Sequence, residues 1–107
     1  MRTLRFDVQG QRLKRNADCD FTHIVSGSVG YLKAAFNFSS EWDGCKKVAS
    51  FWLGEKEHAV LLDEDNTCMI PPAALTGNMF LVSVIGAKTI PKYYRISTSR
   101  IRVRQEV

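Results

Sequence analysis

The stretch YLKAAFNF, residues 31–38, alternates apolar and polar side chains with a period of two. In an extended chain, one face would carry Leu32, Ala34, Phe36 and Phe38. Lys33 and Asn37 would lie on the opposite face, because successive side chains of a strand point to opposite sides. The segment is therefore expected to be a strand with one face in the hydrophobic core.

The same period recurs along the chain, and turn-forming residues interrupt it at intervals of roughly 8–12 residues. The other strands expected are residues 4–8, 12–15, 47–53, 58–62, 67–70, 79–85, 92–98 and 100–107. A short helical turn is expected near 71–75, since proline is tolerated at a helix start but not inside a central strand. The pattern predicts an all-β, immunoglobulin-like, two-sheet antiparallel β-sandwich of about eight strands, with a closed small barrel as the alternative.

The alternation also predicts the core. The residues expected to be mostly buried are Leu32, Phe36, Phe38, Trp42, Val48, Leu61, Phe80, Val82, Val84, Ile96, Ile101 and Val103. The chain has 107 residues, of which 45% are hydrophobic and 24% charged. These values are ordinary for a globular protein, and domains have roughly 100–200 residues, so residues 1–107 are expected to form a single domain.

Several classes of protein are disfavoured by the sequence. No apolar stretch reaches the roughly 18 residues of a membrane-spanning helix, and the N-terminal segment alternates, so neither a membrane span nor a signal peptide is expected. Cys19, Cys45 and Cys68 are an odd number at wide spacings, which favours reduced thiols over a disulfide framework. A zinc site would draw on two of these with His23 and His58. Structural zinc sites show two close ligand pairs, however, so no metal or other cofactor is expected.

Catalysis is not expected either. The two histidines lie in or beside predicted loops, and the chain has neither a G-x-S-x-G elbow nor a glycine-rich phosphate loop. The neighbouring carboxylates at 41 and 43, and those at 63–65, are interpreted as solvated turns. The sequence therefore predicts a protein that is not an enzyme.

The net charge is +4, and it is distributed unevenly. Residues 86–107 hold six Lys and Arg residues against one acid, whereas residues 41–65 hold seven acids against three lysines. This asymmetry is typical of a chain that meets a charged partner, either nucleic acid or the oppositely charged face of a neighbouring copy.

The basic end of the chain supplies the candidate interaction residues. They are Lys92, Arg95, Arg100, Arg102 and Arg104. In a strand, Arg100, Arg102 and Arg104 would share one face at a spacing of about 6.5–7 Å, which approximates that of successive phosphates. Tyr93 and Tyr94 could then stack on bases. The favoured interpretations are a charged edge strand that resists aggregation and a protein interface, with nucleic acid as the alternative.

Residues 31–52 also combine an aromatic alternating strand, Ser-x-Glu-Trp-Asp-Gly and Lys-x-Ala-x-Phe. The residues concerned are Phe36, Phe38, Ser39, Glu41, Trp42, Asp43, Gly44, Lys47, Ala49 and Phe51. An acidic turn, Cys68-Met69-Ile70-Pro71, an Ala-Ala-Leu turn and a strand at 80–86 follow in order. Over roughly residues 29–104, the chain resembles small β-sandwich modules of tailed phages and prophages of Gram-positive bacteria, including the N-terminal domain of the baseplate upper protein.

This resemblance implies a non-enzymatic structural or attachment module of a virion, in the tail, the baseplate or the capsid, assembled in the cytoplasm of the host bacterium. Its partners would be other virion proteins and further copies of itself, with a trimer favoured. In that role Trp42 would cap the core where the chain crosses between sheets, Asp43-Gly44 would allow a tight turn, and Pro71 would end a strand. The alternative function is a small β-barrel that binds single-stranded nucleic acid through its C-terminal basic strand.

Overall fold

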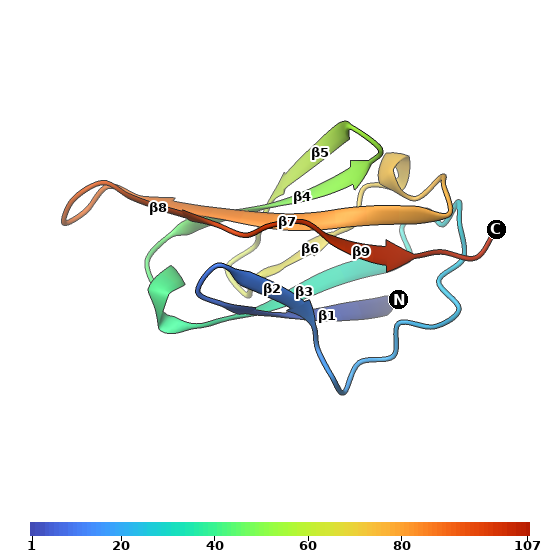
Figure 1. The fold of residues 1–107 in the computed structure, drawn as a ribbon, viewed down its shortest axis with the longest axis horizontal. Coiled ribbons are helices and arrows are strands. Elements are labelled where there is room, and N and C mark those ends of the chain that lie inside the picture. The colour runs from blue at the N-terminus through green and yellow to red at the C-terminus, as the bar shows by residue number, and fades with distance from the viewer.

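The computed structural model describes residues 1–107, which form a sandwich of two β-sheets (Figure 1). The strands are β1 (Arg2–Gln9), β2 (Arg12–Arg15), β3 (Leu32–Phe38), β4 (Lys46–Leu53), β5 (Lys56–Leu61), β6 (Thr67–Met69), β7 (Met79–Lys88), β8 (Tyr94–Ser97) and β9 (Ile101–Arg104). Two short 3₁₀ helices, η1 (Ser40–Trp42) and η2 (Pro72–Ala74), complete the fold. The predicted all-β, two-sheet architecture is thus confirmed, and the short helical turn near 71–75 is present.

The first sheet has the strand order β2-β1-β3-β6. The second has the order β5-β4-β7, and both β8 and β9 pair with the free side of β7. The chain passes from the first sheet to the second through η1 and returns after β5. It crosses a final time through η2. Edge strands β2 and β8–β9 therefore lie at one side of the sandwich, while β6 and β5 lie at the other (Figure 1).

One pairing departs from the expected antiparallel pattern, because β1 and β3 are parallel. A parallel connection needs a crossover of a dozen or more residues, and here β2 and the long segment between β2 and β3 supply it. The Arg2 guanidinium fixes that segment by donating hydrogen bonds to the carbonyls of Asp20, Thr22 and His23. The sequence pattern does not distinguish parallel from antiparallel neighbours, so this correction came only from the structure.

Several strand bounds also differ from the expected ones. Strand β7 continues to Lys88 rather than ending at residue 85, because it pairs with β4 and β8 almost to its end. The last two strands are shorter than expected, covering only 94–97 and 101–104. As a result, the β7–β8 hairpin projects beyond the sandwich, and the molecule measures 46 Å along its longest axis (Figure 1).

Strands β8 and β9 form one interrupted edge strand. Between the pairs Ile85–Ser97 and Val82–Ile101, the edge has three residues where β7 has two, which is the arrangement of a β-bulge. Across this irregularity the Thr98 N–H donates a hydrogen bond to the Val84 carbonyl, and the Thr98 hydroxyl accepts one from the Val84 N–H. The extra residue reverses the alternation, so that side chains before and after the bulge, such as Ile96 and Val103, both face the core.

The core lies between the inner faces of the two sheets and contains 22 buried residues. The residues predicted to be buried that lie below 9% exposure are Leu32, Phe36, Trp42, Phe80, Val82, Val84, Ile96 and Val103. Phe38 and Ile101 are only half-buried, although they pack against the core. The prediction was wrong for Leu61, which is 62% exposed, and for Val48, which is half-buried on the opposite face. In β5 it is Val60 that packs against the core.

Candidate functional site

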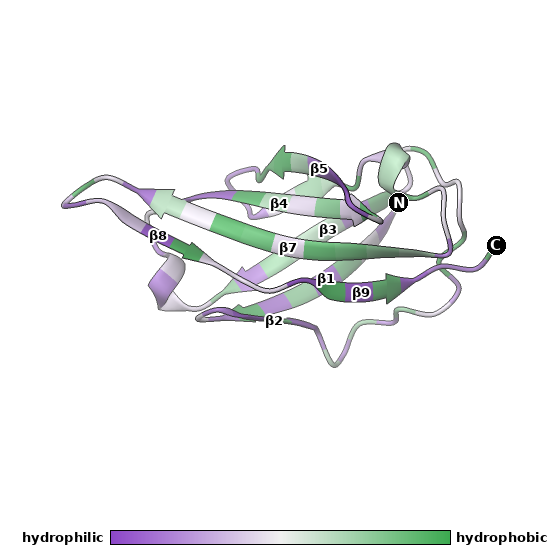
Figure 2. Cartoon of the chain, turned by 45° about the horizontal axis from the view of Figure 1, so that its top comes forward, coloured by the Kyte–Doolittle hydropathy of each residue, from purple (hydrophilic) through white to green (hydrophobic).

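The most unusual surface of the molecule is the face of the five-stranded sheet that points away from the first sheet, termed here the outer face. Strand register assigns to it Lys46, Val48, Ser50, Trp52, Glu57, Ala59, Leu61, Met79, Leu81, Ser83, Ile85, Ala87, Arg95, Ser97, Arg102 and Arg104, and Arg100 reaches it over Trp52. The hydropathy-coloured ribbon in Figure 2 shows β7 apolar along most of its length, and β9 alternating between apolar and polar residues.

The outer face is more apolar than a solvated sheet face usually is, since antiparallel sheets tend to be polar on the side that faces water. Leu61 is 62% exposed and Met79 38% exposed, while Leu81 and Ile85 are half-buried. The outward-facing positions of the first sheet give the contrast within the same molecule. They include Thr3, Arg5, Asp7, Arg12, Lys14, Lys33, Ala35, Asn37, Thr67 and Met69, of which only Ala35 and the exposed Met69 are apolar. The second sheet therefore carries more apolar side chains on its outward side than the first sheet does, and they lie mainly on β4, β5 and β7.

A tryptophan from the inner strand β4 and an arginine that reaches over it from the edge lie close together on the outer face. The Arg100 guanidinium carbon lies 3.6 Å from the centroid of the Trp52 ring, and the Trp52 indole N–H donates a 3.1 Å hydrogen bond to the Ser83 hydroxyl. On the other side, the Ser50 hydroxyl donates a hydrogen bond to the Glu57 carboxylate. Ser50 and Ser83 are only 2% and 6% exposed, so this part of the face is packed rather than open.

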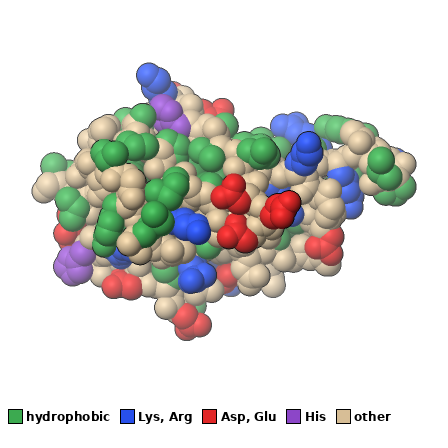
Figure 3. All heavy atoms as spheres, turned by 180° about the vertical axis from the view of Figure 1, so that it is seen from behind, with side chains coloured by type: hydrophobic (Ala, Val, Ile, Leu, Met, Phe, Trp, Pro, Cys, Tyr) green, Lys and Arg blue, Asp and Glu red, His purple; other side chains and the backbone are tan.

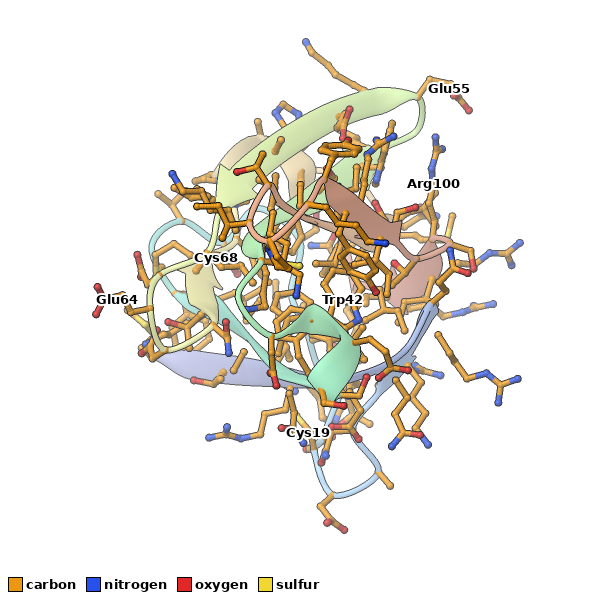
Figure 4. All side chains as sticks on the ribbon, turned by 90° about the vertical axis from the view of Figure 1, so that its left-hand side faces the viewer. Cys19, Trp42, Glu55, Glu64, Cys68 and Arg100 are labelled. Atoms are coloured by element: carbon orange, nitrogen blue, oxygen red, sulfur yellow. The ribbon has the colours of Figure 1, made fainter.

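Four of the five predicted basic residues come together along one edge of the outer face. Arg102 and Arg104 on β9 and Arg95 on β8 all point outward. They share this face because the extra residue of the bulge shifts the alternation of side chains by one position. Arg100, labelled in Figure 4, lies next to β9. Its guanidinium reaches over Trp52. Lys92 is the exception, since it lies in the loop of the projecting hairpin.

The structure separates the predicted stacking tyrosines from Arg102 and Arg104, whereas Arg95 lies next to Tyr94. At one end of β7, Lys88 pairs with Tyr94, and at the other Met79 pairs with Arg104. Nine residue steps separate these pairs, which corresponds to about 30 Å of strand. Tyr94 lies under the Lys88 ammonium group, at 5.2 Å from the ring centroid. The aromatic ring that does lie beside Arg100 is Trp52.

Three further cations, not included in the sequence prediction, lie on the same side of the sandwich, although Arg12 and Lys14 point away from the first sheet and so to the face opposite the outer face. Arg12, Lys14 and Arg15 are exposed on β2, the edge strand of the first sheet. The Gln11 side-chain amide donates a 3.2 Å hydrogen bond to the Ser97 carbonyl, which ties the β1–β2 turn to β8. The sequence showed that residues 12–15 form a basic strand, but not that they share an edge with the C-terminal strands.

We call this set the basic edge: Arg12, Lys14, Arg15, Arg95, Arg100, Arg102 and Arg104. It holds seven of the 15 Lys and Arg residues, and its strands contain no acid. The remaining eight cations stand against all 11 acids, so the rest of the chain has a net charge of 8 − 11 = −3.

Acidic side chains gather on the opposite side of the molecule. Asp63, Glu64 and Asp65 are exposed in the turn between β5 and β6. Figure 3 shows acidic side chains together on the face behind that of Figure 1, and Figure 4 places Glu64 and Arg100 at opposite edges. The Thr67 hydroxyl bonded to Asp65 lowers the pKa of that carboxyl group.

Residues 39–44, the Ser-x-Glu-Trp-Asp-Gly segment, lie at one corner of the sandwich, where the chain passes from β3 to β4. Trp42 is fully buried where the chain crosses between sheets, and its indole N–H donates a 2.8 Å hydrogen bond to the Gly10 carbonyl. The Ser39 hydroxyl accepts a hydrogen bond from the Gly10 N–H and lowers the pKa of Glu41 through a second bond. Together these bonds fasten the β1–β2 turn to the corner.

The remaining motif residues surround the corner or lie elsewhere in the connections. The Asp43 carbonyl accepts a 2.9 Å hydrogen bond from the Lys88 ammonium group. Gly44 has a φ of 77°, a left-handed conformation that favours glycine. Phe38 packs on Trp42 with 5.0 Å between ring centroids, while Pro71 follows β6 where the chain leaves the first sheet for η2.

The cysteines and histidines considered above as zinc ligands do not form a cluster. His23 Nδ1 lies 3.2 Å from Glu106 Oε1, and the Cys19 sulfur accepts a hydrogen bond from the Arg5 N–H. Cys68 is buried in β6, where burial, aided by Asp63, raises the pKa of its thiol to about 12. No helix in the structure has both the length and the apolar character needed to cross a membrane.

Comparison of the chain with family models, with curated proteins and with solved structures finds no match.

Proposed function

We propose that the chain is a non-enzymatic structural module that assembles with other protein chains through the outer face of its five-stranded sheet, as a component of a phage or prophage virion. The observation that carries the assembly role is the apolar character of that face, on which Trp52 and Arg100 lie close together. Tryptophan and arginine are enriched among the residues that contribute most to binding in protein interfaces. The virion context is supported by the motif resemblance of residues 31–52.

The assembly role can be tested with one charged residue placed on either sheet. Leu81→Lys puts a cation at the centre of the outer face, whereas Asn37→Lys adds the same charge to the outward side of the first sheet. Light scattering on concentrated protein should give an oligomer for the wild type and for Asn37→Lys, and a monomer for Leu81→Lys. Circular dichroism would verify that both variants remain folded. A monomeric wild type, or an oligomer unaffected by Leu81→Lys, would contradict the proposal.

A second candidate function is the binding of nucleic acid along the basic edge. The observation that favours it is the concentration of seven cations on two adjoining edge strands. Contacts with phosphates release counterions, so the logarithm of the affinity would fall linearly with the logarithm of the salt concentration. Replacing Arg102 and Arg104 by alanine should then reduce that slope by about two, and an unchanged slope would exclude these arginines as the contact.

A further inference from the structure

The outer face carries a row of side chains that is complementary to itself. Strand register aligns four residues across the sheet, because Glu57 pairs with Trp52, Trp52 with Leu81, and Leu81 with Arg102. Paired residues of adjacent strands point to the same face. The row therefore runs from an anion, through two apolar side chains, to a cation.

The two charged ends of the row do not satisfy each other within one chain. Three strand spacings of about 4.8 Å separate Glu57 from Arg102, which places their backbones about 14 Å apart. Ser50 bonds to one carboxylate oxygen of Glu57, Oε2, and Arg102 is exposed at the basic edge. Each end is thus available to a partner that presents the opposite charge at the same spacing.

We propose that this partner is a second copy of the chain, packed face to face about a two-fold axis that runs parallel to the strands between β4 and β7. The inference rests on the proposed function, since it uses the same outer face. In a two-fold interface, if residue i of one copy contacts residue j of the other, then j also contacts i. Glu57 would meet Arg102 of the second copy, and Trp52, with Arg100 stacked on its ring, would face Leu81 of the second copy, twice in each dimer.

A neighbouring row supports the same axis. Leu61 pairs with Val48, Val48 with Ile85, and Ile85 with Ser97. The same rotation sets Val48 against Ile85 of the second copy, which is an apolar contact, and sets Leu61 against Ser97. Sheets that pack face to face lie about 10 Å apart with nearly aligned strands, which this rotation permits.

Charge selects this axis over the other two-fold arrangement of the face. A two-fold axis perpendicular to the strands would set each strand opposite the same strand of the second copy. Strand β9 would then face β9, and the outward arginines of the two chains would face each other. Like charges brought together across an interface are strongly unfavourable. The axis parallel to the strands instead sets the basic strand against β5, which contributes Glu57.

The arrangement has a consequence for the projecting hairpin. Rotation about an axis parallel to the strands preserves strand direction, so both β7–β8 hairpins would extend from the same end of the dimer. The ends of these hairpins carry Ile90 and Tyr93, which are 83% and 68% exposed. A dimer would therefore offer two apolar tips to one further partner. The proposed assembly is a dimer, whereas the resemblance implied a trimer.

The test is a charge-exchange experiment between two variants. Glu57→Arg places cations at both ends of the row, and Arg102→Glu places anions at both ends. Each variant alone should dimerise at least about tenfold more weakly than wild type, because two like-charged pairs form in every dimer. An equimolar mixture should recover a heterodimer by light scattering. In it, the arginine introduced at position 57 meets the glutamate introduced at position 102, and the native Glu57 and Arg102 meet as in the wild type. The double variant should recover a homodimer, since its two charges are exchanged together.

A matched control separates a specific contact from a general effect of net charge. Glu64→Arg makes the same change of charge at the opposite edge, outside the outer face. Glu64→Arg keeps both ends of the row, so it should dimerise by itself as the wild type does. In a mixture it should not recover dimerisation of Arg102→Glu, which should stay monomeric. If the mixture of Glu57→Arg and Arg102→Glu stays monomeric, or if Glu64→Arg complements equally well, the two-fold register is wrong. If in that case Leu81→Lys still abolishes the wild-type oligomer, only this inference fails and the proposed function stands.

Discussion

Replacing Gly86 by alanine would place a methyl group against the buried indole of Trp42. A Cβ atom at position 86 would lie 2.7 Å from Cε3 and 2.9 Å from Cζ3 of Trp42, and 3.2 Å from the Cβ of Cys45. Separations below 3.0 Å are essentially never adopted by real Cβ atoms. The indole has little freedom to retreat, because it is fully buried and its N–H is bonded to the Gly10 carbonyl at 2.8 Å.

The expected cost follows from these contacts. Overpacking a core typically costs about 1–3 kcal/mol. A shift of the indole that weakened its hydrogen bond to Gly10 would add about 0.5–1.5 kcal/mol. Gly86→Ala should therefore lower the free energy of unfolding by about 2–4 kcal/mol. At roughly 4–8 °C per kcal/mol for a domain of this size, thermal unfolding should occur at least about 8 °C lower than in the wild type.

Chemical and thermal denaturation followed by circular dichroism would measure this change. Gly77→Ala is the matched control, because its closest contact would be a terminal methyl group of Leu53 at 2.9 Å, which can rotate away. We expect the control to stay within about 1 kcal/mol of wild type. A cost below about 0.5 kcal/mol for Gly86→Ala would refute the close packing of Trp42 on β7. In a Trp42→Phe background, which removes the two contacting indole carbons, the cost of Gly86→Ala should fall by about 1 kcal/mol or more.

Four further experiments test separate parts of the fold, the last of them the corner formed by residues 39–44. Phe36→Ala should cost about 3–5 kcal/mol in denaturant titration, because the ring stacks on a neighbouring phenylalanine and is 5% exposed; a cost near zero would mean that the faces of β3 are reversed. Leu61→Ala should change the stability of the monomer by no more than about 0.5 kcal/mol, since the side chain is 62% exposed, and a loss of about 2 kcal/mol would place it in the core instead. At pH 8 only about one Cys68 thiol in 10⁴ is ionised if its pKa is about 12, so iodoacetamide should label Cys19 first; early modification of Cys68 in mass spectrometry would contradict its burial. Because the hydrogen bond from Ser39 holds the folded-state pKa of Glu41 below its ordinary value of 4.5, the contribution of Glu41 to stability is present above that pH and is lost as the pH falls through the folded-state pKa. Glu41→Gln should therefore reduce the dependence of the melting temperature on pH in that acid range. An unchanged pH dependence would argue against the hydrogen bond between Ser39 and Glu41.

The alternation of side chains was sufficient to predict the fold class and most of the core. Residues 31–38 have one clearly apolar face, and residues 79–85 are apolar almost throughout. The burial of Phe36 and Val82 could therefore be predicted from the sequence. The same reasoning was wrong for β5, where Val60, Leu61 and Leu62 are consecutive apolar residues. Period-two alternation cannot choose a face for such a run, and a shift by one residue exchanges inward and outward side chains.

The candidate site required information that local patterns do not contain. Arg95 and Arg102 differ by an odd number of positions, which would put them on opposite faces of a regular strand. The bulge near Thr98 brings them to one face, and no local signal marks it. The contribution of β2 to the basic edge depends on which sheet edges coincide. The apolar outer face arises from pairings between β4, β5 and β7, whose register becomes visible only when the strands are assembled.

The most direct measurement is the solution mass of the wild-type protein by light scattering, at about 0.1 M and about 0.5 M salt, with and without a short single-stranded oligonucleotide. Assembly through an apolar face depends only weakly on salt, whereas phosphate contacts are lost as salt rises. We expect twice the 12.1 kDa mass of one chain in both salts, unchanged by the oligonucleotide. A 12.1 kDa monomer that gains mass with the oligonucleotide only at low salt would contradict assembly through the outer face and identify the basic edge as the functional surface.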